Sequence, residues 1–201
     1  MFLSFSVEGD RDGNHYIGSY GEYGLKDRRH LILEFGRSSG GERRGLASLQ
    51  WALDDGQGAD RLAVSLGLGA LHRDGQTRPM AQIAAGWGRG FDGPMPGWIS
   101  AESRLRVTGD MAASVANYSL PYMTPKVASH LDVTLGLRPW LGWMLVNQLR
   151  FERREDSGFS SKLAVSGLRD LIGPAKLEIG VIVPLSGAGE GAMKIGTWVA
   201  F

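Results

Sequence analysis

Hydrophobic and polar side chains alternate with a period of two along most of this 201-residue chain. In segment 193–201 (MKIGTWVAF), the Met, Ile, Thr, Val and Phe side chains fall on one face, and the Lys, Gly, Trp and Ala side chains on the other. Segments 176–185, 130–138, 99–107, 61–69 and 30–36 repeat the pattern. Because successive side chains of a strand point to opposite faces, these segments are predicted to be β-strands.

Clusters of turn-forming residues separate the alternating segments, as in RDGQTRP at 73–79 and FDGPMPG at 91–97. The chain contains 30 Gly and only 8 Pro, which suits turns and crowded strands better than helices. Together the signals predict about twelve strands. They cover residues 14–25, 30–38, 45–54, 60–73, 79–91, 97–108, 111–122, 127–138, 140–154, 159–171, 175–186 and 191–201.

The lengths of these segments predict how the chain could cross a membrane. The sequence has no run of about 18 apolar residues, so no transmembrane helix is predicted. Tilted strands of about ten residues can span a bilayer. We therefore predict an all-β fold, a transmembrane antiparallel up-and-down β-barrel of about 12 strands forming a single domain over 1–201. Residues 1–13 are either a short periplasmic lead or an additional strand.

Alternation alone does not say which face meets lipid, because a soluble sandwich or lipocalin-like barrel has its apolar side inward. Here the polar face is rich in small residues and in charges of both signs, which suits a confined lumen. Aromatic residues also fall near predicted strand ends, where an interfacial girdle would place them. They are Trp98, Tyr122, Trp140, Trp143 and Phe201. These features favour lipid on the apolar side.

Two segments resemble known outer-membrane proteins. The ending GAMKIGTWVAF is similar to the closing strand of outer-membrane barrels, and this implies recognition by the barrel-insertion machinery through the strand ending at Phe201. The segment YGEYGLKDRRHLIL resembles the EYGLTDR-type hairpin of porin-like families, including those grouped with phenol-degradation outer-membrane proteins, with Lys26 in place of the usual Thr. The resemblance implies the cell outer membrane of a Gram-negative bacterium, with surrounding lipid and lipopolysaccharide as partners. It implies no particular solute.

If the polar face is inward, charged side chains line the lumen. The predicted pore-lining residues are Glu22, Glu34, Arg61, Glu102, Arg104, Arg106, His130, Asp132, Arg138, Arg150, Glu152, Lys176, Glu178 and Lys194, with Lys162 in the same set. They form either charged rings of an ion path or cross-strand ion pairs that fill a narrow barrel.

The arginines Arg104, Arg106 and Arg150 have two interpretations. Guanidinium groups in a lumen can bind carboxylate or phosphate solutes. The carboxylates of Glu102 and Glu152 are near enough in sequence to pair with them, and this favours a structural role.

Other chemistry has weak support in the sequence. The formal net charge of +1 gives no sign of nucleic-acid binding, and the absence of Cys excludes thiolate metal sites. The four His residues are scattered, so no metal site and no cofactor are predicted. Ser129 points to the opposite face from His130 and Asp132, so this set fails as a catalytic triad. Arg43 and Arg44 are interpreted as loop charges that could touch lipopolysaccharide phosphates.

The sequence thus favours a non-enzymatic, passive channel for ions or small polar solutes. A closed barrel with a structural or partner-docking role in an envelope complex is the alternative. A lipid-modifying enzyme is a third hypothesis.

Overall fold

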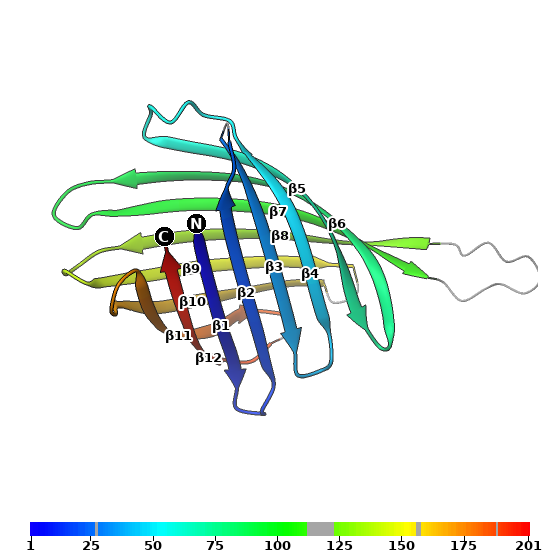
Figure 1. Ribbon diagram of the computed structural model, residues 1–201. Coiled ribbons are helices and arrows are strands. Elements are labelled where there is room, and N and C mark those ends of the chain that lie inside the picture. Colours follow the sequence, from blue (N-terminus) through cyan, green and yellow to red (C-terminus); the bar gives the residue numbers. More distant parts are fainter. Residues whose placement is uncertain (27, 112–122, 156–157, 188) are drawn as a thin grey trace, which may run out of the picture.

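The computed structural model describes residues 1–26, 28–111, 123–155, 158–187 and 189–201, and their strands form one closed antiparallel barrel (Figure 1). Each strand pairs with its neighbours in sequence, as in an up-and-down meander. The strands are β1 (Phe2–Asp10), β2 (His15–Gly24), β3 (Arg29–Ser38), β4 (Arg43–Ala52), β5 (Asp60–Arg73), β6 (Gln76–Phe91), β7 (Gly97–Met111), β8 (Met123–Leu137), β9 (Trp143–Arg154), β10 (Gly158–Asp170), β11 (Ala175–Ser186) and β12 (Ala192–Ala200). This confirms the predicted fold class and a count of twelve.

The first and last strands close the barrel. β1 pairs with β12 over its whole length, from Phe2 opposite Ala200 to Asp10 opposite Ala192. The N and C labels in Figure 1 therefore lie side by side. Of the two alternatives for residues 1–13, the structure shows a strand. Because a missing β1 would leave β2 and β12 with unpaired edges, this strand completes the barrel.

The predicted strand boundaries agree with β2–β12 to within four residues, with one difference. The predicted strand 111–122 has no counterpart among them. Met111 is the last residue of β7, and the remaining residues of that prediction, Tyr122 included, lie outside the described residues. β7 and β8 pair directly with each other as far as Met111 opposite Met123.

The apolar face of the sheet points outward. Leu66 and Leu68 on β5 are 56 % and 74 % exposed, and Ile179, Val181 and Val183 on β11 are about half exposed. An exposed apolar surface that continues around a closed barrel is the arrangement expected against lipid. No helix in the described segments is long and apolar enough to cross a membrane.

A small apolar cluster packs inside the barrel. Met144, Val146 and Leu168 form it, and Trp98 and Trp198 pack against it. The sequence placed Trp98 in an outward girdle, and this was wrong, because its side chain faces inward over Gly136 on the neighbouring strand. A Cβ at Gly136 would come within 2.1 Å of the Trp98 ring. The ring therefore requires glycine at this position.

The connection between β5 and β6 shows how local sequence fixes the register. Asp74 and Gly75 form a two-residue turn and have φ values of 53° and 73°. These values fit a type I′ turn, for which Asp-Gly is a preferred sequence. The turn aligns Arg73 with Gln76, and the hairpin continues in register to Asp60 opposite Arg89.

Candidate functional site

Most of the predicted lumen residues share the inward face of the barrel. They line interior cavities and are Glu22, Glu34, Glu102, Arg104, Arg106, His130, Asp132, Arg150, Glu152, Glu178 and Lys194. Three others, Arg61, Arg138 and Lys176, lie at the end of the barrel that also holds the chain termini. We call this end the terminal mouth, and the opposite end, at the β5–β6 turn, the distal mouth.

The lumen contains a series of cavities between the two mouths. Two cavities, of about 530 and 630 Å³, open at the terminal mouth. Two more, of about 540 and 500 Å³, occupy the middle and share Ser4, Ser6, Tyr20 and Gln148 in their linings. Toward the distal mouth the space narrows to a cavity of about 100 Å³. We call this narrow part the constriction.

Acidic and basic side chains together line the central cavity. Glu8 and Glu34 come from β1 and β3, and Arg104, Arg106 and Arg150 come from β7 and β9. Arg150 reaches across the lumen and donates from Nη1 to Oε1 of Glu8 at 3.1 Å. β1 and β9 are not neighbours in the barrel, so this ion pair divides the cross-section of the lumen.

Of the three predicted arginines, Arg104 and Arg150 pair with carboxylates. Only one of these carboxylates, that of Glu102, was predicted as a partner. Arg104 contacts Asp132 and lies 3.2 Å from the Glu102 carboxylate. Arg150 pairs with Glu8. Glu152, the other expected partner, instead contacts Arg154 and lies 3.6 Å from His130. The structural interpretation therefore holds for Arg104 and Arg150 with a revised set of partners.

Arg106 is bound differently. Its Nε and Nη2 donate to Oε1 of Gln82 at 3.1 and 2.7 Å, and Gln82 is neutral. The Arg106 residue is 8 % exposed. No carboxylate within the described part of the chain lies within ion-pair distance of its guanidinium. Arg106 is thus a buried cation held by an amide, which leaves its positive charge uncompensated.

Two further cations share this property. Arg44 lies over the Tyr16 ring at 5.7 Å, and Lys162 faces the same central cavity. Neither forms an ion pair with a described residue. Glu34 is the carboxylate of this cavity that likewise has no ion pair, so unpaired cations outnumber unpaired anions here. Arg44 and Arg106 also line the constriction, and therefore flank the junction between the two cavities.

Another part of the lumen has a purely structural network. Glu178 is 1 % exposed, accepts a hydrogen bond from Trp198 Nε1 at 2.9 Å, and forms an ion pair with Lys194 at 2.8 Å. Its charge and its hydrogen-bonding capacity are therefore satisfied locally. Glu178 and Lys194 are placed inside as predicted, but they hold each other and strands β11 and β12 together.

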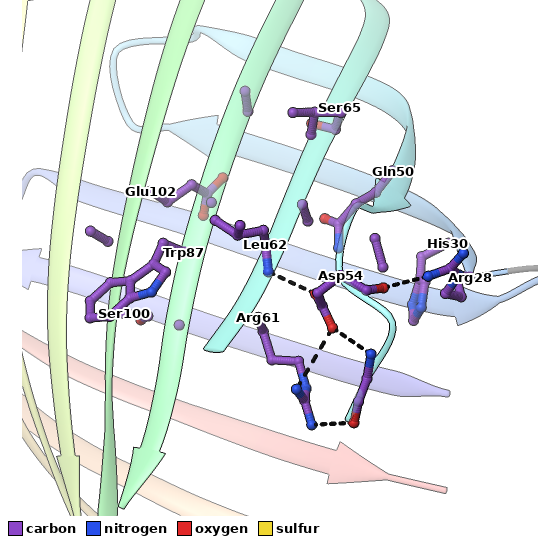
Figure 2. Close-up of a pocket in the computed structure, with 18 of the residues that line it drawn as sticks. Arg28, His30, Gln50, Asp54, Arg61, Leu62, Ser65, Trp87, Ser100 and Glu102 are labelled. Atoms are coloured by element: carbon purple, nitrogen blue, oxygen red, sulfur yellow. Dashed lines mark hydrogen bonds and ion pairs between the residues drawn. The ribbon is translucent and has the colours of Figure 1, made fainter. Parts of the chain in front are cut away.

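The terminal mouth is shaped by the loop between β4 and β5. Figure 2 shows Asp54 among contacts from Arg28, Arg61 and Leu62. The Asp54 carboxylate accepts from the amide of Leu62 at 2.8 Å, and the Arg28 guanidinium donates to the Asp54 carbonyl at 2.6 Å. Arg61 donates to the carbonyls of Gly58 and Gly56 at 2.5 and 3.0 Å. The Arg61 side chain thus holds the loop, at the rim of the cavity.

The electrostatics of Asp54 follow from these contacts. The amide of Leu62 donates to the ionised carboxylate, and this hydrogen bond lowers the pKa of Asp54 below its ordinary 3.8. The Gly56 amide and the charge of Arg61 act in the same direction. The loop at the terminal mouth is therefore built around an ionised carboxylate.

Sequence reasoning missed several residues of the lumen. Glu8 was overlooked because β1 was treated as either a lead or a strand, although Leu3, Phe5 and Val7 alternate with polar neighbours. Arg44 was interpreted as a loop charge, but β4 begins at Arg43, and the register of β3 and β4 places Arg44 opposite Gly36 on the inward face. Arg44 lies two residues before the inward Leu46, and residues two apart on a strand share a face. This spacing could have indicated that Arg44 faces inward.

Ser129 does not join His130 and Asp132 in the lumen. Ser129 lies opposite the outward Leu105, whereas His130 faces inward beside Arg104. The two side chains therefore lie on opposite faces of β8, as the sequence predicted. No group of three or more His, Asp or Glu residues in the described ranges has the geometry of a metal site.

Comparison with known proteins yields likeness of structure and not of sequence. No family model matches the chain, and no curated protein does. The NanC porin superposes with a TM-score of 0.66 at 10 % identity, covering 99 % of this chain and 100 % of the porin. The KdgM porin, solved in complex with oligogalacturonate, gives 0.65 at 6 % identity, covering 100 % and 99 %. An outer membrane channel from Pseudomonas putida F1 gives 0.60 at 12 % identity, covering 100 % and 94 %.

These matches settle the architecture. The chain has the fold of an outer-membrane porin. Identities of 6 to 12 % carry the fold alone, so the activity has to be argued from the lumen of this chain.

Proposed function

We propose that this protein is a passive channel of a Gram-negative outer membrane with a preference for small anionic solutes. The apolar outer surface and the porin-like fold support the location. The series of cavities from one mouth to the other supports passage. Passage through such a lumen needs no cofactor and no covalent step.

One observation carries the proposal, the unpaired cations of the central cavity, two of which flank its junction with the constriction. Arg44, Arg106 and Lys162 have no ion pair among the described residues. In a dry, closed barrel an unpaired guanidinium would carry a large desolvation cost. In a water-filled lumen, water reaches the partly exposed Arg44 and Lys162, and these charges attract anions. The unpaired charges therefore favour the channel over the closed structural barrel.

The constriction itself adds a sign preference. Among its described lining residues, Arg44 and Arg106 are cations without an ion pair, whereas Arg73 and Arg154 contact the carboxylates of Glu42 and Glu152. The narrowest point of a pore contributes most to its selectivity, because solutes there pass closest to fixed charges. An excess of cationic groups at this point favours carboxylate- or phosphate-bearing solutes over cations.

The test is the reversal potential of the refolded protein in a planar bilayer under a salt gradient. The wild type is expected to show conductance steps and an anion-selective reversal potential. The double variant R44Q/R106Q should lose much of that selectivity, since one charge at 4 Å in water contributes about 1 kcal/mol, or roughly five-fold in local anion concentration.

A matched control removes an arginine from the outer surface. Arg169 lies over the outward Trp143 ring at 4.8 Å, so R169Q should leave the reversal potential unchanged. Silence from protein that is verified as folded would instead support the closed barrel. An unchanged reversal potential in R44Q/R106Q would remove these two residues from the solute path.

A further inference from the structure

The outer surface carries a row of basic side chains near the distal mouth. Arg37 on β3 lies directly opposite Arg43 on β4, and Arg43 lies directly opposite His72 on β5. The three side chains share the outward face with Phe35 and Leu68. Direct cross-strand neighbours have Cβ atoms about 5 Å apart, and like charges in this position repel each other. We call these three residues the basic row.

The basic row has no counter-charge among the described residues. Arg37 and Arg43 are exposed, and neither forms a hydrogen bond or ion pair with any described residue. The nearest loop carboxylates, Glu42 and Asp74, instead lie 3.8 and 3.6 Å from Arg73. Among the described residues, the outward positions of β3–β6 carry one carboxylate, Asp60, which lies at the opposite end of β5 from the basic row.

The depth of the basic row coincides with the edge of the apolar band. Next to it on the outward face lie Phe35, Gly45 and Ala70, which are mutual cross-strand neighbours. Trp51 marks the far end of the band on β4, eight residues from Arg43 and thus about 27 Å along the strand. Tilted by about 40°, that length spans about 21 Å along the membrane normal, slightly less than the apolar height of about 25 Å typical of outer-membrane barrels.

A cationic row at the boundary between apolar surface and water meets lipid headgroups. We propose that the basic row is a binding site for the phosphate of a membrane lipid, with the acyl chain lying on the smooth apolar surface beside Gly45 and Ala70. Two guanidinium groups supply several N–H donors to one phosphate, and the anion relieves the repulsion between Arg37 and Arg43. His72 has its Nδ1 3.0 Å from Thr77 Oγ1, so only its Nε2 is available to the phosphate. The site lies outside the lumen, so it stands independently of conduction.

Native mass spectrometry of the full chain in detergent tests this assignment. The probes are lipid A, which carries two phosphates on a glycolipid, and phosphatidylcholine, whose headgroup has no net charge. Lipid A adducts should form on the wild type and be weakened on the order of ten-fold in R37Q/R43Q. Heat-modifiability checks that each variant is folded, and the single variants R37Q and R43Q replace the double variant if it fails to fold.

Arg153 offers a matched control, because it is an outward arginine whose cross-strand neighbours are Ser129 and Phe159. R153Q should bind lipid A like the wild type. Equal binding by R37Q/R43Q, or an equal loss in R153Q, would overturn the proposal. Displacement of lipid A by millimolar inorganic phosphate would also overturn it, because the site would then select free phosphate and not a lipid.

Discussion

The environment of each side chain in this barrel depends on the residues opposite it on the neighbouring strand. Trp98 is possible only because Gly136 leaves room for its ring. Arg106 faces neutral Gln82, whereas Arg104 faces a carboxylate, and so two arginines two residues apart have different charge environments. Such pairings depend on register, which alternation along a single strand does not define. The sequence therefore predicted the inward face of Arg104 and Arg106, but of the carboxylates near Arg104 it predicted only Glu102.

The contact between Trp98 and Gly136 leads to a prediction about stability. G136A should lower the free energy of unfolding by about 1–3 kcal/mol, because the added methyl overlaps the Trp98 ring. G86A is the control, since a Cβ at the inward-facing Gly86 meets no atom within 4 Å. The measurement is the urea midpoint of unfolding in detergent or lipid. Equal midpoints for the two variants would show that the ring moves aside at little cost.

At the level of strands and loops, sequence reasoning succeeded where local chemistry is specific. The Asp74–Gly75 turn and the alternation in β5 and β11 gave those two strands their observed bounds. It left residues 1–13 open between a lead and a strand, because β1 is short and is followed by the turn residues RDG. Only closure of the sheet, a property of the whole barrel, makes β1 necessary as the partner of both β2 and β12.

The β4–β5 loop should depend on pH through Asp54. Its pKa is lowered in the folded protein, so its ionised form contributes stability above pH 3.8, and that contribution is lost as the pH falls through the folded pKa. The D54N variant should therefore unfold at lower urea concentration than the wild type at pH 7. The difference should shrink below pH 3.8. A difference that stayed constant down to pH 2 would mean that the carboxylate charge plays no part in holding the loop.

The whole molecule inverts the arrangement of a soluble barrel. Leucines and isoleucines such as Leu68 and Ile179 are exposed on its outside, and most of the predicted charged residues line its inside. The predicted topology was right, because a period of two and short turns leave little other choice. The predicted count of twelve was also right, because β1 offsets the predicted strand 111–122, which has no counterpart among the described strands. The division of the lumen by Arg150 and Glu8 was not predictable, since these residues are 142 positions apart and are carried by strands that do not pair.

The most direct test of this account compares two adjacent residues of β1. Ser6 lines both central cavities, and Val7 points to the opposite, outward face. The natural chain contains no cysteine, so S6C and V7C each provide one thiol for labelling in proteoliposomes. A small, negatively charged thiol reagent should modify S6C through the water-filled lumen and leave V7C, which faces lipid, unmodified. Modification of V7C with protection of S6C would contradict both the orientation of the barrel wall and the open lumen.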